Sequence, residues 1–181
     1  MMHRSLHSDL VRTAHPFIFA LLLGAAAFAA QPAAAQETEP TVGVQDGRFG
    51  VGFASSWPAY GISGTLQVNE TITAEAVIGF LGTVSNFSGR GWYRFNRKPN
   101  YDLYGYGTAG VYRYGYSLGT ENVLGLGAGV GIEAGLKRML NDPTFPPIFI
   151  NAEIGLGYAD FEYYDFSSFV FGAGIHYRFG N

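Results

Sequence analysis

The chain has 181 residues, of which 48% are hydrophobic and only 14% charged, so it is long enough for one ordinary domain. It contains no cysteine, which excludes disulfides and thiolate zinc sites, and a formal net charge of -3 gives no electrostatic basis for binding nucleic acid. The 26 glycines, 12 tyrosines and 15 phenylalanines are many for a soluble protein and favour a secreted or membrane context.

Residues 1–35 have the pattern of a cleaved signal peptide, with an N-terminal anchor helix as the alternative. Arg4 and Arg12 precede an apolar run that is short for a bilayer span, and small residues at 33–35 suit a signal peptidase. His176 is the only histidine after residue 35, so we expect no multi-histidine metal site and no cofactor. Residues 36–47 are polar and without pattern, and we expect a flexible lead.

From residue 48 onward, apolar residues alternate with glycine or polar residues, which predicts β-strands. In the clearest run, every second residue from Leu124 to Leu136 is apolar and most residues between them are glycine. The predicted strands are 48–57, 60–68, 72–81, 88–95, 101–113, 124–136, 148–158 and 168–179. The facing of 101–113 is ambiguous because its tyrosines lie opposite its aliphatic residues. The connection 137–147 is longer than the turn expected there.

One face of most predicted strands is apolar, and the other consists of glycine and a few charged residues. Glycine and charges cannot form the close-packed dry core of a soluble barrel. A transmembrane β-barrel accommodates this pattern, because its apolar side chains face lipid and its polar and small ones face the lumen. We therefore predict an all-β fold, a transmembrane antiparallel up-and-down barrel of about eight strands over residues 48–181. A secreted soluble ligand-binding barrel would instead need inward-pointing apolar faces.

The C-terminal run, residues 172–179, resembles the terminal-strand signal of bacterial outer-membrane barrels. Gly174, Tyr177 and Phe179 carry this resemblance, as a glycine followed by two aromatic residues spaced by one. The chain is similar to the small outer-membrane β-barrel family that includes the OmpA transmembrane domain, OmpX and the opacity-type proteins. The resemblance implies the outer membrane of a Gram-negative-type bacterium as location. It also implies membrane lipids, lipopolysaccharide and the barrel-assembly machinery as partners.

Charged residues of the polar faces are expected to meet in the lumen. With the alternation described above, the lumen receives Glu75, Arg90, Arg94, Glu133, Glu153, His176 and Arg178. We expect one ionic layer near the rim that holds the C-terminus, with Arg178 and Glu153 as a pair, because an unpaired charge there would be costly. A gated ion path through this layer is the alternative.

We expect a non-enzymatic protein with a structural or surface-interaction role. A lipid-modifying enzyme similar to the lipid A deacylases would need a paired serine and histidine, and the sequence places no serine next to His176 on its strand. The glycine stripes lie inside predicted strands with no helix after them, which argues against a phosphate loop. The acidic and aromatic stretch 160–165 is a candidate contact for a surface ligand that the sequence does not identify.

Overall fold

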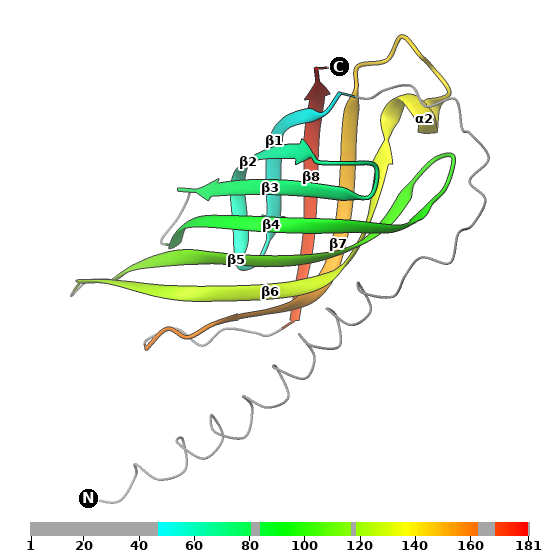
Figure 1. Ribbon diagram of the computed structural model, residues 1–181. Coiled ribbons are helices and arrows are strands. Elements are labelled where there is room, and N and C mark those ends of the chain that lie inside the picture. The colour runs from blue at the N-terminus through cyan, green and yellow to red at the C-terminus, as the bar shows by residue number, and fades with distance from the viewer. Residues whose placement is uncertain (1–46, 81–83, 117–118, 163–168, 181) are drawn as a thin grey trace, which may run out of the picture. The chain divides into compact units, whose positions relative to one another are not determined.

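The computed structural model describes residues 47–80, 84–116, 119–162 and 169–180. Eight antiparallel strands form one closed barrel, in which each pairs with its sequence neighbours and β8 pairs with β1 (Figure 1). The strands are β1 (Phe49–Ser56), β2 (Ala59–Gln67), β3 (Ile72–Gly79), β4 (Val84–Arg97), β5 (Asp102–Tyr116), β6 (Gly119–Gly135), β7 (Ile148–Ala159) and β8 (Phe169–Phe179). The N–H of Arg48 donates to the carbonyl oxygen of Gly180 at 3.2 Å. Both ends of the barrel therefore meet at one rim, the terminal rim; the opposite one is the far rim.

The predicted up-and-down barrel of about eight strands is confirmed. Strands β4, β5 and β6 extend further at the far rim than the alternation predicts, because polar residues such as Asn122 and Glu121 continue the backbone pairing without an apolar face. The predicted signal peptide 1–35, and the lead as far as residue 46, lie outside the described residues. No helix in the described ranges is long and apolar enough to cross a membrane.

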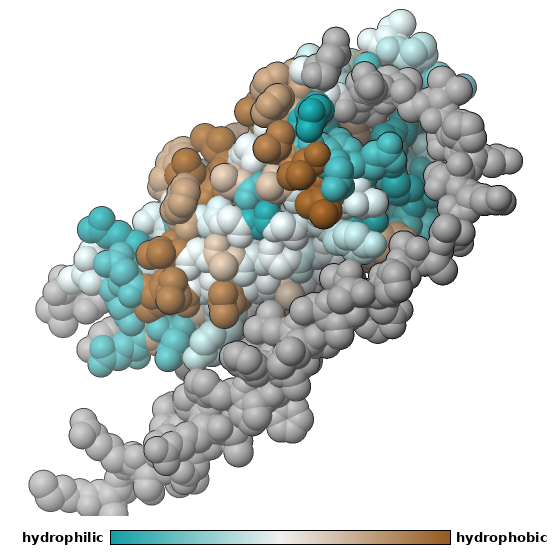
Figure 2. All heavy atoms as spheres, viewed as in Figure 1, coloured by the Kyte–Doolittle hydropathy of each residue, from teal (hydrophilic) through white to brown (hydrophobic). Residues whose placement is uncertain are grey.

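The outer wall is apolar and the lumen is not. Large apolar side chains are exposed along every strand, and Figure 2 shows them gathered on the barrel's side with hydrophilic residues at its ends. Strand β5 follows the same rule: Tyr104 and Tyr112 are fully buried in the lumen, whereas Val111 is half exposed. Exposed aromatic side chains lie at both rims, as in the interfacial girdles of membrane barrels. They include Phe49, Phe95, Tyr177 and Phe179 towards the terminal rim and Phe80, Phe87, Phe169 and Phe171 towards the far rim.

The long connection after β6 contains a short helix, α2 (Leu136–Leu140), which lies at the terminal rim (Figure 1). The helix ends at Asn141, whose φ of 50° is left-handed, and the N–H of Asp142 donates to the carbonyl oxygen of Lys137 at 3.1 Å. The Asp142 carboxylate accepts hydrogen bonds from the hydroxyl and the N–H of Thr144, which lower the pKa of Asp142. The connection is therefore longer than a tight turn because it contains a helix and a hydrogen-bonded turn after it.

The inward glycines of β6 make room for tyrosine rings of β5. A Cβ atom added at Gly131 would lie 2.5 Å from Cζ of Tyr104, and one added at Gly125 would lie 2.5 Å from Cε2 of Tyr112. Tyr104 cannot retreat easily, because its ring stacks on Trp92 with centroids 4.8 Å apart. The glycine stripe therefore reflects the size of the neighbouring rings in a narrow barrel.

Replacing an inward glycine should destabilise the barrel, whereas replacing an outward one should not. We expect Gly131→Ala to lower the free energy of unfolding by about 1–3 kcal/mol through overpacking. The matched control is Gly89→Ala on the outer face, where an added Cβ has no atom within 4 Å, and its stability should equal or exceed the wild type. Urea unfolding in lipid vesicles measures both. Equal losses for the two variants would contradict the assigned faces.

Candidate functional site

The middle of the lumen holds an ionic cluster centred on Arg90, which we call the central cluster (Glu75, Arg90, Glu153 and His176). The guanidinium of Arg90 lies 3.1 Å from Oε2 of Glu75 on β3 and donates to Oε2 of Glu153 on β7 at 2.6 Å. The three side chains are at most 1% exposed. Arg90 also lies over the ring of Tyr106, 4.6 Å from its centroid. One arginine thus joins strands on opposite sides of the barrel through its centre.

Aromatic and amide groups complete the coordination of the two carboxylates. The indole N–H of Trp92 donates to Oε2 of Glu75 at 3.2 Å. The hydroxyl of Tyr104 donates to Oε1 of Glu153 at 2.7 Å, and the amide of Asn151 donates to the same hydroxyl at 3.0 Å. Since buried carboxylates are stable only with such partners, the ion pairs and their surroundings form one structural unit.

His176 has a serine partner that its own strand does not reveal. Its Nε2 lies 2.6 Å from Oγ of Ser63 on β2, so the expectation of no neighbouring serine is wrong: Ser63 is distant in sequence and reaches His176 across β1. The same Nε2 lies 3.3 Å from Oε1 of Glu75. In a nucleophilic triad the carboxylate orients the other ring nitrogen. Here both partners meet one nitrogen, and Ser63 and His176 are at most 2% exposed.

A second ionic cluster, the rim cluster (Arg94, Asp102, Glu133 and Arg178), lies towards the terminal rim. Arg94 donates to Oε2 of Glu133 at 2.8 Å, and Arg178 bonds to the other oxygen of that carboxylate. Asp102 lies 3.5 Å from Nε of Arg94. Arg178 also lies over the ring of Phe149, with 3.9 Å between Cζ and the ring centroid. All four cluster members are buried.

The structure therefore differs from the expected single layer in two respects. The seven candidate residues are all buried in the lumen, but their ion pairs divide between two clusters. The expected pair of Arg178 with Glu153 is wrong. The β7–β8 register places Glu153 opposite Gly172, six residues from Arg178, or about 20 Å along the strand. Asp102, Ser63 and Tyr104 are site residues that the sequence interpretation did not include.

An aromatic cap fills the lumen between the central cluster and the far rim. The ring centroid of Trp57 lies 5.6 Å from that of Tyr112 and 6.2 Å from that of Phe161. Pro58, next in the β1–β2 turn, is fully buried, and a Cβ at Gly127 would lie 3.0 Å from it. Phe161, part of the candidate ligand stretch 160–165, is buried at 6% exposure, and residues 163–165 lie outside the described ranges.

The three residues of the terminal-strand pattern occupy two different faces. Tyr177 and Phe179 point outward, 48% and 47% exposed, and Phe179 stacks on Phe49 across the β1–β8 closure with centroids 6.5 Å apart. Gly174 faces inward, where an added Cβ would lie 2.3 Å from the amide oxygen of Asn151. The aromatic pair therefore faces the membrane side, while the glycine is needed for packing in the lumen.

A closed eight-stranded barrel with an apolar outer wall and buried ion pairs inside is a transmembrane β-barrel. The chain belongs to the outer membrane protein beta-barrel domain family, whose pattern it matches over residues 19–181. The fold is similar to the N-terminal β-barrel domain of OprF from Pseudomonas aeruginosa, with a TM-score of 0.50 and 12% identity over 71% of this chain and 93% of that one.

A second similar structure is the de novo designed TMB2.3, with a TM-score of 0.41 and 18% identity over 75% of this chain and 96% of that one. No curated protein matches the sequence.

The two clusters should respond separately to mutation. Arg90→Met and Glu153→Gln should each cost about 3–5 kcal/mol, because each leaves a buried charge without its partner. The double variant should be more stable than the sum of the two losses predicts, by about 0.5–3 kcal/mol. Urea unfolding in vesicles measures this coupling.

The control cycle pairs Arg178→Met with Glu153→Gln, which affects one member of each cluster. These losses should add to within about 0.5 kcal/mol. Strong coupling in the control, or its absence between Arg90 and Glu153, would contradict the division into two clusters.

Proposed function

We propose that the protein is a non-enzymatic structural barrel of the outer membrane, with a lumen that its own side chains close. The observation that carries this proposal is the fully buried bridge from Glu75 through Arg90 to Glu153, which crosses the middle of the lumen. The aromatic cap fills the lumen beyond it, and the rim cluster fills it on the other side. The interior of an eight-stranded barrel is just wide enough for its own side chains to fill it.

The arrangement of Ser63 and His176 supports a packing role over a catalytic one. Both side chains lie below the cap, and the one ring nitrogen that faces Ser63 also faces Glu75. A lipid-modifying enzyme would need this pair open to a lipid substrate, with the carboxylate on the other ring nitrogen. The same burial of Arg90 favours a closed lumen over a gated channel.

The cellular context is part of the proposal. Membership of the outer membrane protein beta-barrel domain family supports an outer-membrane location, and we infer export by a signal peptide cleaved near residue 35. The partners that fit this setting are membrane lipids, lipopolysaccharide and the assembly machinery. The far rim is available for a surface ligand, and no nucleic acid, metal or cofactor is needed for a structural role.

Planar-bilayer recordings test the closed lumen directly. The wild-type barrel should give a near-silent trace under conditions in which a large porin gives stable open steps, because ion pairs and aromatic rings block its lumen. Heat-modifiable migration on gels should confirm that the reconstituted protein is folded. Regular openings of the folded wild type, enlarged by Arg90→Ala, would contradict the closed barrel and favour a gated channel.

Recognition by the assembly machinery should depend on Phe179 more than on its stacking partner. Phe179→Ala and Phe49→Ala remove the same ring contact from the same wall, but only Phe179 lies in the terminal strand. We expect Phe179→Ala to reduce assembled barrel in cells several-fold more than Phe49→Ala, with similar refolding of both in detergent. Membrane fractionation and heat-modifiable migration measure this. Equal loss in cells would indicate a packing role alone.

A further inference from the structure

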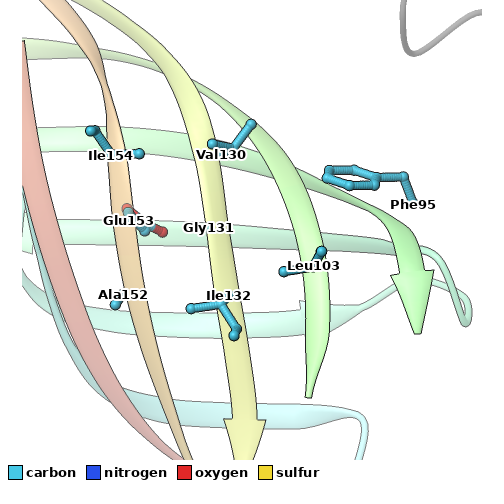
Figure 3. A pocket seen from close by; sticks show the side chains of 8 residues that line it. All are labelled: Phe95, Leu103, Val130, Gly131, Ile132, Ala152, Glu153 and Ile154. Carbon is cyan, nitrogen blue, oxygen red and sulfur yellow. The ribbon is translucent and has the colours of Figure 1, made fainter. Parts of the chain in front are cut away.

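An apolar groove of about 440 Å³ lies on the outer wall across β4 to β7 (Figure 3). Phe95 and Leu103 form one side, Ala152 and Ile154 of β7 form the other, and Gly131 of β6 lies between them. The remaining apolar lining is Val130 and Ile132 from β6. Glu153 of β7 also belongs to the lining, but its carboxylate is turned into the lumen, where it accepts from Arg90. The groove is shallow and its other lining residues are apolar or glycine, which suits a hydrocarbon chain better than a polar ligand.

The groove leads towards the terminal rim at the depth of one membrane leaflet. Val130 is five residues from Gly135, where β6 ends, about 17 Å along the strand, and a strand tilt of 35–45° reduces this to roughly 13 Å across the membrane. Lys137 lies two residues further on, in α2. Half of a hydrocarbon core of about 30 Å is about 15 Å. A lipid of the leaflet at the terminal rim can therefore place a chain in the groove while its headgroup lies near Lys137.

Basic residues gather where such a headgroup would lie. Lys98 in the β4–β5 turn and Lys137 in α2 lie on the two connections that border this end of the groove, and neither makes an ion pair within the described residues. Next to Lys137, the exposed Met139 and Leu140 make α2 apolar as well as basic, which is typical of segments at a membrane surface. The rim thus combines apolar side chains with the ammonium groups of Lys98 and Lys137.

The far rim has the opposite charge. Among the described residues, the charged side chains at the far rim are those of Arg113, which is positive, and of Glu121, Asp160 and Glu162, which are negative. An anionic headgroup is therefore favoured at the terminal rim and disfavoured at the far rim.

We propose that the groove and the two lysines form a binding site for one anionic phospholipid of the leaflet at the terminal rim. One acyl chain lies in the groove, and the phosphate lies between Lys98 and Lys137. This site depends on the proposed function in one respect: the outer wall of the barrel must face lipid. Charge complementarity favours a phospholipid over a second copy of the chain, whose matching wall would bring the same lysines together.

Native mass spectrometry of the folded barrel tests the site. The barrel in zwitterionic micelles is titrated with phosphatidylglycerol or with phosphatidylcholine carrying the same chains. Phosphatidylglycerol should bind more tightly, and each lysine removed should weaken it about 5-fold, or about 25-fold for Lys98→Gln with Lys137→Gln. The matched control is Arg113→Gln at the far rim, which should leave binding unchanged.

Filling the groove separates the chain from the headgroup. Ala152→Phe should weaken the binding of both lipids several-fold. Soluble glycerophosphoglycerol, which has the headgroup without acyl chains, should bind poorly to every variant. Equal binding of the two lipids, or no effect of the lysine variants, would overturn the proposal. A dimer that persists without lipid and is lost in Ala152→Phe would replace the phospholipid with a second copy.

Two further measurements on the same samples distinguish the lipid site from the closed lumen. Each variant is checked for heat-modifiable migration, which reports folding, and the wild type is checked for bilayer conductance. A conducting barrel that still prefers phosphatidylglycerol through its lysines would overturn the closed lumen and retain the lipid site.

Discussion

Arg90 is the side chain around which the interior is arranged. It bridges Glu75 and Glu153 across the lumen, so β3 and β7, which are not neighbours in the sheet, are held together at the centre. Each carboxylate then recruits its own donor, Trp92 for one and Tyr104 for the other. Because a charge buried without partners would cost several kcal/mol, these neighbours are constrained as strongly as the ions themselves.

The space around Arg90 also determines the glycine pattern. The ring of Tyr104 on β5 passes close to Gly131 of β6 to reach Glu153 on β7, and the absence of a side chain at Gly131 permits this. On the outer wall, by contrast, a Cβ added at Gly89 would have no atom within 4 Å, so packing does not require glycine there. Glycine thus serves ring packing inside the barrel, and the same residue type has a different consequence outside it.

Alternation along the sequence predicted the strands, the barrel and the burial of the charged side chains, because a period of two follows directly from strand geometry. It could not predict which charges pair, because that depends on register: the β7–β8 alignment separates Glu153 from Arg178. Ser63 was missed since its contact with His176 crosses a strand. Asp102 could have been found, because an aspartate facing lipid is costly and its parity matches that of Tyr104 and Tyr106.

The strands differ greatly in length, from 8 residues in β1 to 17 in β6. Among the described residues, backbone pairing between β6 and β7 ends at Gly125, and the segment from Gly119 to Leu124 pairs in the sheet with β5. Outside the sheet, the carboxylate of Glu121 accepts the N–H of Glu162 at 2.9 Å. A two-stranded ribbon of this kind is marginally stable by itself, unlike the closed wall below it. Local opening should therefore begin at this hairpin, and its amide protons should exchange with deuterium long before those beside Arg90. The barrel thus combines a ring held by buried ion pairs with an arm that extends beyond them, and this arm can change shape without breaking the ionic interior.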